Sequence, residues 1–419
     1  MFDQVFKKVL ARRRMAASHF AIILKPFAAY LCGRGHVTGS IQMYVQAVEH
    51  FGRWLKTKCA SIPQIRDKHA AAFLERHLPV CHCEVPAVRN LRTCRAALAR
   101  LLDFLRHTRT IPTELAQAWA TTPAERLLAD YDRHMTEVRG LALQTRRARI
   151  RYAKEFLVWR FRKGPLSFNE LQPRDLSNYV TIRSKALGSG SVGVMVGGIR
   201  GLLRFLEFSR KLRQPLSRVV PRPAPTPVNP PTRILRKEEK LRVLRSFDRR
   251  KPSGLRDFAV GLCLSELGLR ASEVAALCID DLDWKRMTVR LAQTKQQRER
   301  VLPLPSEAAR ALAYYLKNGR PQSRTRAVFV RHRAPLGDAL KPHHVHGLIR
   351  RAFVQAGIPP TGTHTLRHTW ATEAHRRGVP LKSVADVLGH TSLNSTSRYT
   401  HINLEELRQA ALPWPASPR

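Results

Sequence analysis

Apolar residues recur at helical spacing through the first half of the chain. One stretch places four of them on a single helix face, and a later stretch repeats this arrangement with aromatic residues. The residues are Val45, Val48, Phe51 and Leu55 in the first stretch, and Tyr152, Phe156 and Trp159 in the second. The pattern predicts amphipathic helices that pack around small cores.

The two stretches belong to a longer internal repeat. A motif from Gly35 to Trp54, Gly-x4-Ser-x10-Phe-x2-Trp, returns 105 residues later between Gly140 and Trp159, with Thr in place of Ser. A leucine-rich helix also recurs after each motif. We therefore predict two related four-helix units of about 90 residues, a size that can fold alone. Chance similarity between amphipathic helices is the alternative.

A proline-rich segment follows the second copy. Seven prolines crowd between Lys211 and Arg233, interleaved with arginines. Such a segment favours extended geometry over helix, and we interpret it as a linker between domains. Its arginines could follow a phosphate backbone, or the segment could be only a solvated spacer.

Beyond this segment, helix-periodic and strand-periodic stretches alternate. Residues 255–267 follow helical spacing, whereas residues 287–291 alternate between apolar and polar as in a half-buried strand. Residues 301–304 are the expected hairpin partner, and their proline indicates an edge strand. The turn between the two strands carries Lys295 near its tip. The remaining chain is predicted to be helical, with one helix from Pro380 to Gly389.

Charge changes this picture by pointing to a partner. The 419 residues include 74 Lys and Arg against 31 Asp and Glu, a formal net charge of +43. Such an excess indicates a polyanionic partner, with nucleic acid first. A membrane surface is a weaker candidate, because no apolar run of about 18 residues is present. The alternative is a compositional preference for surface Arg, which rarely leaves so few acids.

Several cysteines and histidines lie close together in the sequence. The chain has seven cysteines, an odd number, and no secretory signal, which indicates reduced thiols in a cytosol. Cys81, His82 and Cys83, with His77 and Cys94, are metal-ligand residue types, but their spacing fits no common zinc pattern. We expect no metal and no cofactor.

Five short segments in the last third place reactive residues in one order: an Arg, a Lys, a His-x-x-Arg, a His and a Tyr. Together they supply what metal-free phosphodiester chemistry needs, namely cationic donors, a proton donor, a proton-shuttling His and a phenol nucleophile. Tyr314 and Tyr315 lie outside the segments and are assigned to packing. The segments are Gly268–Glu273, Gln293–Lys295, His364–His368, Leu388–His390 and Arg398–Tyr399.

Local signals predict where the two arginines lie. Gly268 has the position of a helix C-cap and Ser272 that of the next N-cap, so Arg270 should lie at a corner between helices. His364 and Arg367 are three residues apart, so they should share one helix face. A helix end would then position Arg270, and a helix face would position Arg367.

The segments resemble the catalytic domain of the tyrosine recombinases, the phage-integrase family, over roughly residues 235–410. The helical units resemble the family's DNA core-binding domain more weakly, and two units instead of one depart from the usual pattern. The matching boxes are Gly-Leu-Arg-Ala-Ser-Glu at 268–273, the hairpin pattern of Lys295, Arg300 and Pro303, His-x-x-Arg-His at 364–368, Leu-Gly-His at 388–390, and Tyr399.

Charge and the resemblance together suggest how phosphate would be held and attacked. Negative charge grows on the phosphoryl oxygens in the transition state, and Arg270 and Arg367 would clamp them as planar donors. By the resemblance, Tyr399 would attack phosphorus and give a 3′-phosphotyrosine and a free 5′-hydroxyl. Glu273 would orient this group without reacting. Because the covalent bond stores the phosphodiester energy, no ATP is needed.

Three further residues would handle protons or phosphate. Lys295 is the candidate acid for the leaving 5′-oxygen. His364 would help to accept the tyrosyl proton, and His390 would bond the phosphate or tune that transfer. These residues complete the set of the resembling family.

The resemblance also implies partners and parts. Partners are double-stranded DNA, a homotetramer on paired sites, and other recombinases of the same system; we expect no membrane contact, and a bacterial cytoplasmic, nucleoid-associated protein. The fold class is mostly α with a small β-sheet. The predicted parts are 1–120, a helical unit for DNA or protein contact; 121–212, a core-binding helical unit; 213–233, the linker; and 234–419, a mixed α/β catalytic domain.

The predicted function is site-specific DNA recombination or integration, for a mobile element. A type IB topoisomerase is one alternative, and it would relax DNA without a specific paired site. A non-catalytic DNA-binding partner in a multi-recombinase system is another. The complete set of catalytic residue types argues against that last reading.

Overall fold

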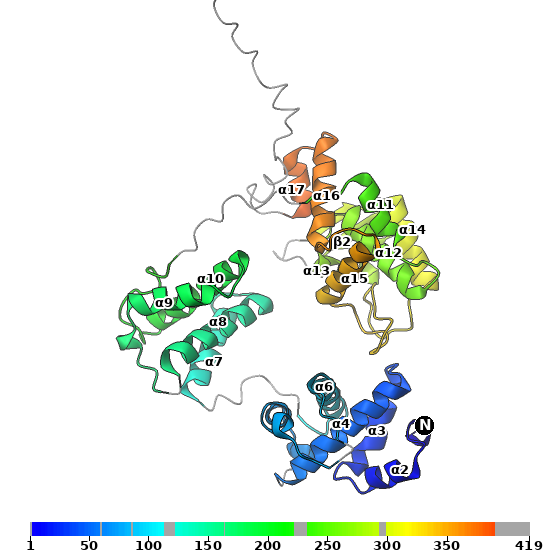
Figure 1. Cartoon of the computed structure of the whole chain (residues 1–419). Helices are drawn as coiled ribbons and strands as arrows, with labels where there is room; N and C mark the ends of the chain where they lie inside the picture. Colours follow the sequence, from blue (N-terminus) through cyan, green and yellow to red (C-terminus); the bar gives the residue numbers. More distant parts are fainter. Residues whose placement is uncertain are drawn as a thin grey trace, which may run out of the picture. The chain divides into compact units, whose positions relative to one another are not determined.

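Figure 1 shows a computed structural model of the chain, which describes residues 2–58, 61–84, 87–112, 122–162, 164–221, 233–292 and 299–389. These residues are mostly helical and include one small sheet, so the predicted fold class is confirmed. Contacts group the chain into two compact bodies, Met1–Ile111 with Pro231–Arg419, and Pro112–Pro230. The first body contains two large hydrophobic cores and the second body one.

The first core belongs to the N-terminal helices, which we call the first helical unit. The long helix α4 packs against both α3 and α6 (Figure 1). Its predicted apolar face is confirmed, since Val45, Val48, Phe51 and Leu55 are all buried. The elements are α1 Phe2–Val5, α2 Val9–Ala16, α3 Ala21–Gly33, α4 Thr38–Lys56, η1 Ile62–Gln64, α5 Asp67–Ala72, the π-helical turn η2 Phe73–His77, η3 Leu78–Val80 and α6 Leu91–His107.

The second core lies in the second helical unit, where α8 packs against α7 and α10. Thr122 and Glu125 begin α7 with a reciprocal pair of bonds. The Glu125 amide donates to Thr122 Oγ1 (3.2 Å), and the Thr122 amide donates to Glu125 Oε2 (3.1 Å). The elements are α7 Pro123–Glu137, α8 Leu143–Phe161, η4 Phe168–Glu170, α9 Pro173–Ser184 and α10 Ser189–Phe208.

The two helical units share a common local design. Helices α4 and α8 are both 19 residues long, and each end of α8 lies 105 residues after the corresponding end of α4. Phe51 meets Phe73 edge-on, with ring centroids 5.4 Å apart, and Phe156 meets Tyr179 in the same way at 5.2 Å. The sequence repeat therefore corresponds to the same packing of aromatic side chains in both units.

The segment predicted as a linker begins as part of the second core. Leu216 and Val220 are buried there, and the Ser217 amide donates to Glu207 Oε1 (2.7 Å). The prediction of a linker from residue 213 was wrong for residues 213–221, because these two apolar side chains bury their surface against the helices. Residues 222–232 lie outside the described residues.

The third core belongs to the C-terminal part. Its antiparallel sheet has the order β1-β2-β3, and Val289 pairs with Leu302 in the register between β2 and β3. The predicted hairpin is confirmed, and β3 is the edge strand that its proline indicated. The elements are α11 Lys237–Arg245, α12 Pro252–Ser265, α13 Ala271–Ala276, η5 Ile279–Asp281, β1 Leu282–Asp283, β2 Thr288–Leu291, β3 Arg300–Pro303, α14 Ser306–Asn318, α15 Pro342–Gln355, α16 Thr363–Arg376 and α17 Leu381–Leu388.

Helix α12 lies at the centre of this part and packs against α14, α15 and α16. The predictions for two tyrosines on α14 had different outcomes. Tyr315 is buried, as predicted, but Tyr314 is 58% exposed, so its assignment to packing was wrong. Adjacent residues on a helix point in different directions, so only one of the pair can face α12.

Among the described helices, no single one is long and apolar enough to cross a membrane. Helices α2 and α3 reach the length and hydropathy of a membrane span only when taken together, and they are bent by 120° at the break between them.

Candidate active site

Arg270 lies where the sequence placed it, at the corner between α12 and α13. Gly268 makes this corner with a φ of +61°, and a Cβ there would lie 2.9 Å from the Trp370 ring, so glycine allows α16 to approach closely. The predicted N-cap was wrong: Arg270 itself occupies that position, and Ser272 lies inside α13. The carboxylate of Glu273 accepts the Arg270 amide at 2.8 Å, so it does the work expected of a capping side chain.

Glu273 is the centre of the cationic group. Its side chain is fully buried, and its Oε1 accepts both Arg270 Nη1 (2.8 Å) and Arg300 Nη2 (2.7 Å). Arg367 Nη1 lies 3.7 Å from the other oxygen. One carboxylate therefore holds three guanidinium groups, and the group carries an excess of positive charge that suits a phosphate.

The C-terminus of α17 is the second anchor of these arginines. The last carbonyls of a helix have no partner within it and carry the negative end of the helix dipole. Here three consecutive carbonyl oxygens each accept a bond from a different arginine. Arg300 donates to Val387, Arg367 donates to Leu388, and Arg270 donates to Gly389 at 3.3 Å.

Arg367 is the most deeply placed of the three arginines. Its side chain is 4% exposed, against 17% for Arg270, and it donates through Nη1 to the Gly268 carbonyl (2.6 Å). It therefore joins α16 to the corner that carries Arg270. His364, one turn earlier on α16, is exposed, and its ring centroid lies 6.2 Å from that of His368. The two predicted residues share α16 but differ in depth.

Arg300 belongs to this group, although the sequence gave no reason to expect a role for it in the site. In the sequence it was only part of the hairpin pattern, three residues before Pro303. Burial lowers the pKa of Arg300, with a smaller contribution from Arg270, while Glu273 opposes the shift; a guanidinium nevertheless stays protonated in proteins. Arg300 stands directly opposite Leu291, so it fixes the base of the hairpin beside the other arginines.

The described structure brings together four residues from distant segments: Arg270, Glu273, Arg300 and Arg367. Three predicted catalytic residues, Lys295, His390 and Tyr399, lie outside the described residues.

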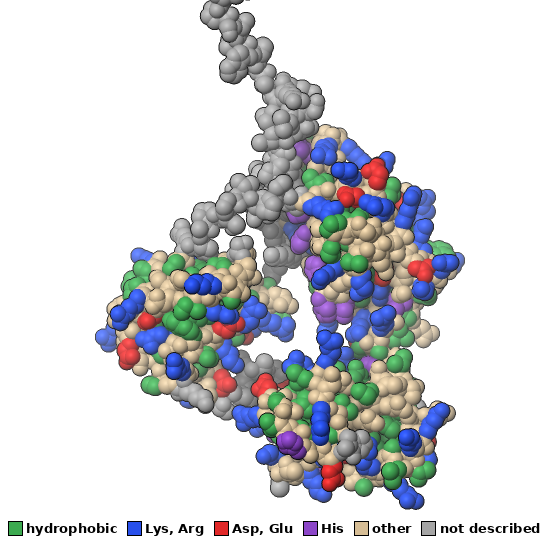
Figure 2. All heavy atoms as spheres, viewed as in Figure 1, with side chains coloured by type: hydrophobic (Ala, Val, Ile, Leu, Met, Phe, Trp, Pro, Cys, Tyr) green, Lys and Arg blue, Asp and Glu red, His purple; other side chains and the backbone are tan. Residues whose placement is uncertain are grey.

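Basic side chains also spread over the wider surface. On the face shown in Figure 2, Lys and Arg appear on every described part and outnumber the acidic side chains. Such a surface favours binding to a polyanion over a broad area, with phosphates as the principal contacts.

Comparison with known proteins places this group of residues in context. The sequence model of the phage integrase family matches residues 233–406. A putative integrase/recombinase of Sinorhizobium fredii, y4rA, is 32% identical over 397 residues, which cover 94% of each chain. Tyrosine recombinase XerC 2 of Ralstonia nicotianae is 30% identical over 286 residues, 65% of this chain and 80% of that one.

Solved structures show the same fold. The Tn1549 transposon integrase in complex with circular intermediate DNA has a TM-score of 0.54 and 18% identity, over 68% of this chain and 97% of that chain. XerH recombinase bound to a palindromic difH substrate has a TM-score of 0.52 and 18% identity, over 88% of this chain and 95% of that chain. The likeness to XerH therefore extends through most of the length of this chain.

Proposed function

The chain belongs to the phage integrase family of tyrosine recombinases, enzymes that cut and rejoin DNA, and we propose that its site-specific recombination proceeds through a phosphotyrosine at Tyr399. The observation that carries the proposal is the buried Glu273 carboxylate with Arg270, Arg300 and Arg367 around it. A group with more cations than its single anion can neutralise is suited to the charge that grows on a phosphoryl group.

Arg270 and Arg367 would hold the two non-bridging oxygens of the scissile phosphate. Arginine suits this role because its planar fork can donate two parallel bonds. Glu273 would fix the guanidinium groups before the substrate arrives, so that little reorganisation is needed in the transition state. Arg300 would serve the same purpose by joining the hairpin to α17.

Tyr399 would attack the phosphorus, form a bond to the 3′-phosphate and displace the 5′-oxygen. Lys295 would donate the proton that this oxygen takes, and His364 would help to receive the tyrosyl proton. His390 would bond the phosphate or adjust that transfer. Attack of the free 5′-hydroxyl on the phosphotyrosine would then reverse these steps and rejoin the DNA.

Double-stranded DNA is the proposed partner, held by the two helical units and the C-terminal part. The basic surface supports this proposal, as does the similarity in fold to integrases solved with DNA. We propose that the two helical units and the C-terminal part act as a clamp around the duplex, with residues 213–221 assigned to the second helical unit. Pairing of two sites would bring four chains together, with other recombinases of a mobile element as further partners.

A topoisomerase or a non-catalytic partner is a weaker interpretation. The relatives are named as integrases and recombinases, and no described feature favours either alternative. A recombinase would need a specific paired site for cleavage, whereas a topoisomerase would relax any supercoiled DNA.

Replacement of Tyr399 by Phe tests the proposal. We expect Tyr399→Phe to abolish the covalent protein–DNA adduct on a nicked site, because the substitution removes the nucleophilic oxygen and no cation. DNA binding should stay nearly unchanged, since phosphate contacts dominate the affinity. The adduct can be detected after denaturation, with Tyr314→Phe as the matched control on an exposed tyrosine. An adduct that persists in the Tyr399 variant would place the nucleophile elsewhere.

A further inference from the structure

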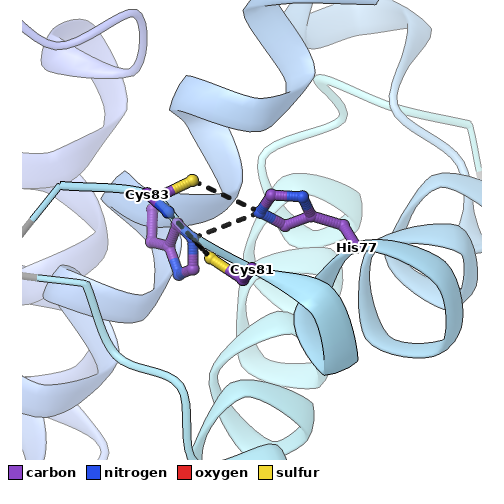
Figure 3. Close-up of side chains that lie close together, drawn as sticks. His77, Cys81 and Cys83 are labelled. Atoms are coloured by element: carbon purple, nitrogen blue, oxygen red, sulfur yellow. Dashed lines mark hydrogen bonds between the residues drawn. The ribbon is translucent and has the colours of Figure 1, made fainter.

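Four metal-ligand side chains converge in the first helical unit, far along the chain from the active-site boxes. His50 lies on α4, His77 ends η2, and Cys81 and Cys83 follow η3. One ligand atom from each lies within 4.8 Å of every other. Figure 3 shows His77, Cys81 and Cys83 close together, with the ring of His77 directed toward the Cys83 sulfur.

Three of the distances between the ligand atoms are those of a tetrahedral zinc site. Zinc bonds of about 2.3 Å to sulfur and 2.0–2.1 Å to nitrogen imply about 3.3 Å between two nitrogens and about 3.5 Å between nitrogen and sulfur. The Nε2 atoms of His50 and His77 are 3.4 Å apart. Cys81 Sγ lies 3.3 Å from the first of these nitrogens, and Cys83 Sγ lies 3.5 Å from the second.

The environment of His50 prepares its Nε2 to bind a metal. His50 is fully buried, and its Nδ1 lies 3.0 Å from the Val88 carbonyl, which can only accept a hydrogen bond. The proton is therefore on Nδ1, and the lone pair is on the nitrogen that faces the cluster. A metal-bound histidine usually has such a backbone carbonyl behind it.

Cys94, which the sequence placed in this cluster, has a different role. Its Sγ donates to the same Val88 carbonyl at 3.1 Å. The Cys94 thiol therefore supports the carbonyl behind His50. The fourth ligand is instead His50 on α4. It lies 27 residues before His77, too far away in the sequence for the spacing of neighbouring residues to reveal it.

The second helical unit has an ion pair at the positions that correspond to His50 and His77 in the first unit. At the positions that correspond to His50 and His77 in the repeat, it has Glu155 and Arg183, whose side chains form an ion pair at 2.6 Å. Opposite charges thus join α8 to α9 there. In the first helical unit the same junction has two imidazoles in place of the ion pair, and their Nε2 atoms face each other at 3.4 Å beside the two cysteine sulfurs.

We propose that His50, His77, Cys81 and Cys83 bind one structural zinc ion. The four side chains fill a tetrahedral coordination shell, so no position remains for a reactant, and the role is structural. Two thiolates would balance the charge of Zn²⁺. The ion would hold the segment from His77 to Cys83 against α4. This site is separate from the active site, where no metal is expected.

The test uses the full-length protein, purified under reducing conditions. We expect one zinc ion per chain after dialysis without chelator. When Co²⁺ replaces the zinc, we expect the thiolate-to-cobalt charge-transfer absorption that ligation by cysteine produces. This second measurement needs no substitution, so it does not depend on the folding of a variant. A wild-type protein without bound zinc, or a cobalt form without thiolate absorption, would overturn the proposal.

Substitution assigns the ligands. Cys81→Ser/Cys83→Ser should reduce the zinc content to background and lower the melting temperature. His82→Ala should leave both unchanged, because His82 lies between the two cysteines and is exposed. Zinc that remains at one ion per chain in the double variant would show that other residues bind it and would overturn the proposal.

Discussion

At the scale of single residues, the active site depends on the charge of Glu273. Its side chain is fully buried, and three guanidinium groups lie within 4 Å of its two oxygens. Without this carboxylate the arginines would repel one another with no anion between them. The cost of such a change is high, because the remaining charges stay buried and uncompensated.

We predict that Glu273→Gln destabilises the protein by on the order of 3 kcal/mol. The amide keeps the shape of the carboxylate but loses its charge, so Arg270 and Arg300 should shift away from their present positions. A misplacement of about 1 Å can reduce a rate on the order of 10²-fold. Denaturant unfolding and the rate of adduct formation measure the two effects.

Glu307→Gln is the matched control, since Glu307 is exposed on α14. It should leave stability and cleavage nearly unchanged. If Glu273→Gln behaved like this control, the carboxylate would not organise the arginines.

At the scale of elements, the C-terminus of α17 determines where the site is assembled. Its last turn ends at Gly389, which has a φ of +60° and lies against the Arg300 guanidinium. A Cβ at this position would lie 3.0 Å from that guanidinium, so a larger residue must displace Arg300. The helix end therefore serves both as a C-cap and as a surface for the arginines.

We predict that Gly389→Ala strains the backbone and also disturbs catalysis. A left-handed conformation costs an L-residue about 1–2 kcal/mol. The added methyl group should also move Arg300 from Glu273 and slow cleavage on the order of 10²-fold. Thermal unfolding and single-turnover cleavage separate these two contributions.

Gly357→Ala provides a close control for backbone strain. Gly357 follows α15 with a φ of +67°, and a Cβ there would meet no atom within 4 Å. This variant should lose similar stability while it cleaves DNA at the normal rate. Equal cleavage rates in the two variants would refute a role for the contact between Gly389 and Arg300.

At the scale of the whole molecule, the separate hydrophobic cores allow the first helical unit to be removed without opening another core. The core of this unit runs from Val5 to Ile111 and includes no residue of the other two large cores. Its helices also contain none of the active-site boxes. Its role should therefore be in binding.

We predict that a protein beginning at Thr122 still forms the Tyr399 adduct at low salt. This start preserves the reciprocal bonds between Thr122 and Glu125. Fewer phosphate contacts should weaken binding and reduce its dependence on salt concentration. Binding and adduct formation should be measured across a salt series beside the full-length protein. Loss of cleavage at low salt in a folded truncation would make the first helical unit part of the active assembly.

The sequence by itself determined the features that depend on neighbouring residues. Alternation predicted the β2–β3 hairpin, because side chains on a strand point to opposite faces in turn. Gly389 marked the end of α17, because only glycine adopts a positive φ without strain. Gly268, predicted as the C-cap of α12, lies two residues after the actual C-cap, Glu266, and makes the turn that follows. The repeat and the active-site boxes were visible for the same reason, since each is a short pattern of residue types at fixed spacing.

The tertiary structure alone decided which distant residues meet. Arg300 joined Glu273, and His50 replaced Cys94 beside Cys81, although nothing near them in sequence predicted either contact. Leu216 likewise lies in the core of the second helical unit, although the sequence predicted a linker there. These contacts are long-range. They form because buried surfaces from separate segments pack together, and buried polar groups must find partners there. The spacing of residues within one segment cannot predict which other segment supplies the partner.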